Sequence, residues 1–483
     1  MKKILLINPE YSRTYFSLPV LPAGLGYLAE SLGRHSIDYR VIDMSLGYKT
    51  RPLYSEIRKF RPDFIGITCI SYMLKNTYEV VRGIKEMFPD VKIVIGGPHV
   101  SSIKEEVLKQ CEALDFAIVG EGEVSLPELI LGKPQEGIKG LIFREGENLV
   151  FNGHRDFFAN LDSLGFPKYK GFEMNRYGYK MIGIVTSRGC PYSCIYCSCN
   201  VIGKQIRFRS ANSIVEEIQY WYGLGYREFG IQEDNPTFDR SRMLQICSAI
   251  QKKGFKGLKL MCGNGVRADR VDRQLLIEMK KAGFKRLAFG VESGSDKVLK
   301  AIRKGSTVEI MDRAIREATD LGFFVSLFFL VGSPSETNED VLASVSLALK
   351  YPVQCIDFFN LIPLPGSELF DWVRDNGYFL VAPENYLNAR QHPARSVFPV
   401  FQTPEFPGEE RMRMLRHTKN ITRKVKRRAL REKFPQLGKF GDILFYIYCS
   451  DFVNSIEHFL LSSEVIRKSL GRFRMKLRDL FYE

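Results

Sequence analysis

The stretch from residue 187 to residue 197 reads SRGCPYSCIYC and places cysteines at positions 190, 194 and 197. Three thiolates on one loop can hold three irons of a cubane cluster, and the fourth iron then stays open, as a catalytic metal site requires. The alternatives are a zinc knuckle or three core cysteines. Zinc sites usually take four protein ligands in pairs, and no fourth ligand follows in such a pattern, although Cys199 is close. The spacing therefore favours a 4Fe–4S cluster on Cys190, Cys194 and Cys197.

Apolar runs alternate with helical patterns on the amino-terminal side of this loop. We expect strands at 4–8, 39–42, 64–69, 92–95 and 116–119, separated by helices such as 23–32, 77–87 and 103–111. Strands that are buried on both faces and separated by helices predict a doubly wound parallel sheet, here over residues 1–132. Ligands bind such sheets beyond the carboxyl ends of the strands.

The alternation resumes beside the cysteine loop. We expect strands at 183–186, 228–231, 258–261, 286–290, 325–331 and 356–361, with helices between them. This pattern predicts a partial (β/α)6 barrel over residues 181–368, with its active site at the carboxyl ends of the strands. Residues 133–180 are expected to be a connector with a small hairpin, and residues 369–483 a basic, mainly helical tail with an aromatic stretch at 440–461. The fold class is α/β.

The charge and composition of the chain limit the classes of protein to which it can belong. The formal net charge is +15, and residues 401–483 hold 18 Lys and Arg against 10 Asp and Glu. The longest strongly apolar stretch, 323–331, is too short to span a bilayer, so we expect a cytoplasmic protein. The basic run from Arg411 to Arg428 would bind phosphates without reading sequence, and no motif for specific nucleic-acid binding is visible. A peripheral membrane contact through the tail and a helical lid on the barrel are both open alternatives.

The cysteine loop resembles the signature of the radical S-adenosylmethionine (SAM) enzymes, and the match extends over residues 183–367. Tyr196, the aromatic residue before the last cysteine, also fits that signature and would pack near the SAM adenine. The resemblance implies that SAM chelates the open iron. It also implies that the reduced cluster cleaves SAM to a 5′-deoxyadenosyl radical, with electrons from a reductase or from a flavodoxin or ferredoxin. Cofactors of this kind carry the chemistry, and the protein positions and shields them.

The ends of the later barrel strands agree with this resemblance. A carboxylate after the second strand would face the SAM ammonium group, and an arginine after the third would bind the SAM carboxylate. The fourth strand end would face the ribose, and the fifth would lie near the adenine. Each of these loops alone could be an ordinary turn. Matching loops at the ends of all six strands together, however, strongly favour the resemblance. The implied SAM residues are Tyr196, Glu233, Asp234, Arg267, Glu292, Ser293 and Gly332.

The amino-terminal domain resembles the cobalamin-binding domain of the B12-dependent radical SAM class. The matching pieces are residues 22–28, 96–99 and 120–123. The resemblance implies cobalamin as a cofactor, bound by Ser71, Gly96, Gly97, Pro98, Gly120, Glu121 and Gly122. Many such domains place a cobalt-ligating His after the first strand, but residues 9–14 here read PEYSRT. We therefore expect cobalt without a His ligand from that motif, and we expect His99 to line a loop.

Three hypotheses follow. The first is an enzyme that methylates an unactivated carbon or phosphorus centre of a small-molecule or lipid-like substrate, which must lie between barrel mouth and corrin. The second is another radical reaction on the same scaffold, such as cyclisation or rearrangement without methyl transfer. The third is a non-enzymatic cobalamin or iron–sulfur carrier or sensor that binds nucleic acid through its tail. No residue pattern identifies the substrate.

Overall fold

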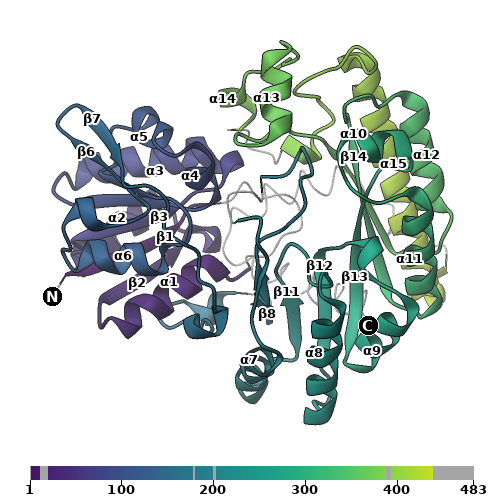
Figure 1. The fold of residues 1–483 in the computed structure, drawn as a ribbon, viewed down its shortest axis with the longest axis horizontal. Coiled ribbons are helices and arrows are strands. Elements are labelled where there is room, and N and C mark those ends of the chain that lie inside the picture. Colours follow the sequence, from purple (N-terminus) through teal and green to yellow (C-terminus); the bar gives the residue numbers. More distant parts are fainter. Residues whose placement is uncertain (1, 11–19, 178–179, 199–202, 388–392, 439–483) are drawn as a thin grey trace.

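The computed structural model describes residues 2–10, 20–177, 180–198, 203–387 and 393–438. Two sheets with helices around them carry the architecture, the first on the left of Figure 1 and the second on the right. This is the expected α/β class. The aromatic stretch at 440–461 and Cys199 lie outside the described residues.

The first sheet is doubly wound. Its parallel strands are β1 (Lys3–Asn8), β2 (Asp38–Asp43), β3 (Phe64–Thr68), β4 (Lys92–Gly96) and β5 (Phe116–Ile118), in the order β2-β1-β3-β4-β5. Alternate residues of β1 enter separate cores on the two faces, Leu5 and Ile7 on one and Ile4 and Leu6 on the other. The order reverses between β1 and β3, and ligands of such folds bind at that point.

Helices cover both faces of this sheet: α1 (Ala23–Arg34), α2 (Thr50–Phe60), α3 (Leu74–Met87), α4 (Pro98–Ile103), α5 (Glu106–Gln110) and α6 (Gly122–Ile130). The helix expected at 103–111 is wrong in its bounds. Lys104 adopts a left-handed backbone with φ of 52°, which ends α4 and separates it from α5.

The hairpin expected in the connector joins the first sheet. Its strands, β6 (Leu141–Glu145) and β7 (Asn148–Phe151), extend that sheet antiparallel from β5. The rest of the connector packs against α1. A Cβ on Gly26 would lie 2.7 Å from the Tyr169 ring, so the small residues of the 22–28 stretch allow this close contact.

The second sheet is parallel and curved, with the order β15-β14-β13-β12-β11-β8. Its strands are β8 (Met181–Ile184), β11 (Glu228–Ile231), β12 (Lys259–Val266), β13 (Phe284–Glu292), β14 (Phe324–Val331) and β15 (Cys355–Asn360). The helices α7 (Ala211–Gly223), α8 (Arg240–Lys253), α9 (Arg273–Lys281), α10 (Asp296–Ala301), α11 (Val308–Asp320) and α12 (Asn338–Leu349) alternate with the strands. Phe229, Phe289 and Phe329 pack into the core beneath them. The partial barrel is therefore as expected.

The described part of the tail packs on the barrel. It contains α13 (Glu368–Asp375), α14 (Pro383–Tyr386) and the long α15 (Gly408–Lys433), which contacts β15 and α12. Arg411, the first residue of the basic run, is fully buried and donates hydrogen bonds to Asn360 Oδ1 and to the carbonyls of Leu361 and Phe401. One face of α15 is thus core, as for a helical lid. Among the described residues, the helices are all too short or too polar to cross a membrane.

Candidate functional site

The cysteine loop is held at its base by a two-stranded ribbon, β9 (Ser187–Arg188) with β10 (Arg207–Phe208). Its three thiols are half-buried, and the Cys190 amide donates to the Gly203 carbonyl at 3.2 Å. Gly189 is required there, because its φ is +99° and a Cβ would lie 2.4 Å from the Gln205 carbonyl oxygen.

Burial raises the pKa of Cys190, and the neighbouring Asp234, Cys197 and Cys194 raise it further. The thiols are thus close enough to act on one another. Yet in the part of the chain that is described, no three His, Cys, Asp or Glu side chains converge on a point that would hold a single metal ion. A zinc ion would need sulfurs about 4 Å apart, given Zn–S bonds of ~2.3 Å. Three thiolates on one loop can hold three corners of a cubane cluster.

Two buried cations lie beside this loop. Burial raises the pKa of Cys194, whereas Lys304 and Arg267 lower it. The Lys304 ammonium donates to Glu292 Oε1 at 2.8 Å, and the Tyr196 hydroxyl donates to the same oxygen at 3.1 Å. The expected residues Tyr196 and Glu292 therefore contact each other directly, and Lys304, which the sequence analysis missed, binds the same carboxylate oxygen. Lys304 follows α10 by three residues, and no motif marks it.

Arg267 is close to the cluster loop but its guanidinium is engaged. It donates to Asp269 at 2.9 Å and to the Lys304 carbonyl at 2.7 Å, and it stacks 3.6 Å from the centre of the Tyr192 ring. These contacts fix Lys304 and the cysteine loop relative to each other.

Polar atoms without partners gather after β11. Glu233 is buried, and its Oε2 accepts hydrogen bonds from the Thr186 amide at 2.9 Å and from the Thr186 hydroxyl. Its Oε1 has no hydrogen-bond partner among the described residues, and neither have the side-chain atoms of Asn235 and Thr237, both of which are buried. Burial raises the pKa of Glu233. Unsatisfied buried groups of this kind fit the amino and carboxylate groups of SAM.

Ser293 and Gly332 make their contacts within the barrel. The Ser293 hydroxyl accepts from the Ser295 amide at 3.2 Å and lies 3.5 Å from Ser344 of α12. A Cβ on Gly332 would lie 1.8 Å from Arg411, so that glycine leaves room for the buried guanidinium.

The amino-terminal candidate residues gather at the carboxyl ends of β3 and β4. His99 is 1% exposed in α4, and its Nδ1 lies 3.0 Å from the Ser71 hydroxyl in the short turn Ser71–Met73. Its Nε2 is without a hydrogen-bond partner in the described structure, as is Asn8 Oδ1 at the end of β1. Gly97 has φ of +111°, and a Cβ there would lie 2.7 Å from the Cys69 carbonyl oxygen. Buried polar atoms at the switch point of the sheet fit a ligand with a polar tail, as cobalamin has.

Glu121 joins the two domains, because it binds arginines of the second domain at the carboxyl end of β5. Arg188 and Arg207, the paired residues of the cysteine ribbon, each donate to its carboxylate at 2.9 Å. Arg188 also donates to Glu123 at 2.6 Å. Burial would lower the pKa of Arg188, but Glu123 and Glu121 raise it above its ordinary value. We call these four residues the interdomain clamp. Sequence reasoning missed both arginines.

A second contact joins the same ends of the two sheets. A Cβ on Gly366, just after β15, would lie 2.9 Å from Ser102 of α4. The carboxyl ends of β4 and β5 thus meet those of β15 and β8, and the two candidate ligand sites face each other.

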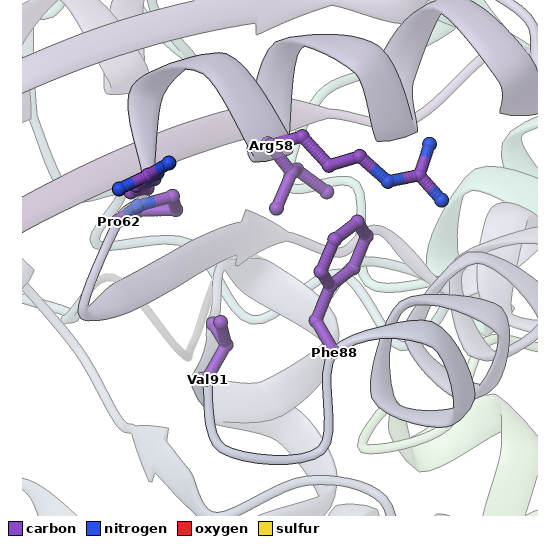
Figure 2. Close-up of a pocket in the computed structure, with 6 residues that line it drawn as sticks. Arg58, Pro62, Phe88 and Val91 are labelled. Carbon is purple, nitrogen blue, oxygen red and sulfur yellow. The ribbon is translucent and has the colours of Figure 1, made fainter.

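A further groove of about 470 Å³ lies elsewhere on the amino-terminal domain. It is formed between α2 and the segment that leads into β4, and Figure 2 shows Arg58, Pro62, Phe88 and Val91 around it. Pro62 lies two residues before β3, and Val91 directly precedes β4. The groove is therefore at the amino ends of these strands, opposite to the candidate site.

Comparison with known proteins agrees with this geometry. The sequence profile of the Radical SAM superfamily matches residues 184–348, and that of the B12 binding domain matches residues 14–130. An uncharacterised methyltransferase of Pyrococcus horikoshii is 29% identical over 86% of this chain and 91% of its own length. An anaerobic magnesium-protoporphyrin IX monomethyl ester cyclase of Cereibacter sphaeroides is 26% identical over 77% of this chain and 64% of its own length.

A solved structure shares the fold. The cobalamin-dependent S-adenosylmethionine radical enzyme OxsB superposes with a TM-score of 0.70, covering all of this chain and 76% of the OxsB chain at 18% identity. At that identity the likeness concerns the fold alone.

Proposed function

Because this chain belongs to the radical SAM enzymes that carry a B12-binding domain, we propose that it methylates an unactivated carbon or phosphorus centre. Its cofactors are a 4Fe–4S cluster, SAM and cobalamin. Bound together, they supply a radical that removes a hydrogen atom and a methyl group that replaces it. The reaction needs a substrate and a reductant, and we propose a flavodoxin or ferredoxin as electron donor.

The observation that carries the proposal is the facing arrangement of the two candidate sites. The interdomain clamp and the contact of Gly366 with Ser102 hold the carboxyl ends of both sheets together. A substrate between them would be within reach of both cofactors, which is what methyl transfer to a radical requires. The Pyrococcus relative, named as a methyltransferase and matched over most of its length, supports the same reaction.

The residues of this chain would bind and orient the cofactors. Cys190, Cys194 and Cys197 would hold the cluster. Glu233, with Asn235 and Thr237, would take the amino end of SAM, and Tyr196 with Glu292 would border its adenosine. Asp234 would adjust the charge beside Cys190. Cobalamin would lie against Ser71, Gly96, Gly97, Pro98, Gly120 and Gly122, whose backbone permits close approach.

A different reaction class has one specific observation in its favour, since the Cereibacter relative is named as a cyclase. Cyclisation or rearrangement would use the radical but not the methyl group. The two reactions therefore differ in what becomes of SAM.

The deciding experiment uses reconstituted protein, hydroxocobalamin, a reductant and SAM with a deuterated methyl group, incubated with a metabolite extract. Methylation predicts that S-adenosylhomocysteine and 5′-deoxyadenosine both form and that a product carries the label. Formation of 5′-deoxyadenosine alone, with an unlabelled product, would instead assign the chain to the cyclase class. The Cys194→Ala variant controls for cluster-independent breakdown of SAM.

A further inference from the structure

The turns at the amino ends of the barrel strands form a surface that the candidate site does not use. The strands β11, β12, β13 and β14 are neighbours in the sheet and pair near their amino ends, for example Glu228 with Lys259 and Leu260 with Phe284. The ends of α7, α8, α9 and α11, and the turns that follow them, therefore lie side by side. We call this surface, made of residues 219–228, 251–259, 278–285 and 319–323, the amino-end face.

The amino-end face is strongly basic. Two of its acids are paired, since Glu228 lies 3.9 Å from Lys259 and Glu278 lies 2.7 Å from Lys281. The remaining acid of these segments is Asp320. Against it stand six cations that contact no carboxylate of the described chain: Arg227, Lys252, Lys253, Lys256, Lys280 and Lys285. The face therefore carries a large excess of positive charge.

The ends of the helices explain part of this charge. Lys252 and Lys253 end α8, and Lys280 lies in the last turn of α9, where cations are favourable beside the free carbonyls of a helix. Lys256 and Lys285, by contrast, lie in the turns beyond these helices. Both are exposed, and their ammonium groups make no hydrogen bond within the described residues. Their charge is therefore available to a partner.

Apolar side chains lie beside these lysines. Tyr220 and Leu224 are one turn apart at the end of α7, and they are 38% and 59% exposed. Lys253 donates to Gln219 at 2.8 Å, so its ammonium group lies at the same end of α7. Exposed apolar side chains within a basic surface are typical of proteins that bind the interface of a membrane.

We propose that the amino-end face binds the surface of an anionic lipid bilayer. The lysines would lie at the lipid headgroups, and Leu224 would insert between them. Nucleic acid fits this face less well, because five of the six free cations are lysines rather than arginines. The aliphatic Leu224 also has no partner on a phosphate backbone. The candidate cofactor sites are at the opposite ends of the strands, so a bilayer on this face leaves them accessible.

Flotation of the reconstituted protein with lipid vesicles tests the proposal. We expect binding to phosphatidylcholine vesicles that contain about one third phosphatidylserine, and none to pure phosphatidylcholine. Added salt should weaken the binding, because it screens the lysines. Near an anionic membrane each lysine changes the affinity about fivefold. We therefore expect binding to be at least about tenfold weaker in the triple variant Lys253→Gln, Lys256→Gln and Lys285→Gln.

A second triple variant removes the same charge from other surfaces and is the matched control: Lys49→Gln, Lys59→Gln and Lys424→Gln, all of them exposed. It should bind like the unchanged protein, which also distinguishes this face from the basic helix α15, where Lys424 lies. Absence of binding to the anionic vesicles, or an equal loss in both triple variants, would overturn the proposal.

Leu224→Ser separates a membrane from nucleic acid, since it removes the apolar contact and keeps the charge. Vesicle binding should become several-fold weaker in this variant. Unchanged binding would show that charge alone holds the vesicles, and displacement of the protein from vesicles by a duplex RNA would assign the face to nucleic acid. Either result would contradict the proposed insertion into a bilayer.

Discussion

Replacing Glu121 with Gln should loosen the cysteine loop from the amino-terminal domain. Arg188 and Arg207 are opposite each other in the ribbon, 16% and 6% exposed, and both donate to this carboxylate. In the variant a neutral amide stands between the Arg188 and Arg207 guanidinium groups, and each of them loses its ion pair with the Glu121 carboxylate.

The expected cost follows from the burial of these charges. Removing one partner of a buried ion pair costs roughly 3–5 kcal/mol. Glu123 still holds Arg188 in the variant, so we expect the lower end of this range. About 3 kcal/mol corresponds to an opening equilibrium changed by about 150-fold.

Hydrogen–deuterium exchange measures this opening. The amides of Cys190 and Arg209 donate to Gly203 and Thr186, so peptides from 186–198 and 203–210 report on the ribbon. They should exchange up to about 150-fold faster in Glu121→Gln, and iron should be lost to a chelator sooner. Glu128→Gln is the matched control, since Glu128 is on the same helix as Glu123 and pairs with Lys133 and Arg155, away from the loop. Equal exchange in both variants would refute the reasoning.

Three further predictions concern other parts of the molecule. Cys194→Ala should lose the iron of the reconstituted protein, whereas Cys111→Ala, in the other domain, should retain it; metal analysis decides. Gly332→Ala should lower the free energy of unfolding by about 3 kcal/mol, because its Cβ would overlap Arg411, whereas Gly146→Ala, at an open hairpin turn, should cost only about 1 kcal/mol in denaturant titrations. Burial lowers the pKa of His99 from 6.5 to about 4, so the unfolded chain binds the extra proton between these values and stability should fall as the pH falls from 6.5 to 4. Replacing His99 with Gln should remove that part of the pH dependence, and an unchanged pH profile would show that the histidine is already charged when folded.

The elements with strong periodicity could be read from the sequence. The parallel strands lie within a few residues of their expected places, because runs such as FVSLFFLV at 324–331 leave few alternatives to a buried strand. The helix expected at 103–111 is observed as α5 but begins three residues later, since the left-handed Lys104 has no signal in an ordinary Ile-Lys-Glu sequence.

The cysteine loop could be predicted because its spacing is contiguous, but the residues around it come from distant segments. Lys304 reaches Glu292 from beyond α10, and Arg207 reaches Glu121 across 86 residues. Such pairings depend on tertiary packing, which no local pattern encodes. For the same reason Glu121, which stands in a glycine-rich strand end typical of ligand binding, proved to contact arginines of the other domain.

The burial of Arg411 determines the smallest fragment of this chain that should fold on its own. The radical SAM profile ends at residue 348, yet a fragment cut there would lose β15, and one cut after residue 368 would leave Gly332 beside a hole and the Asn360 side chain and Leu361 carbonyl without their donor. A barrel excised for grafting or for chimeric enzymes should therefore run at least to the end of α15.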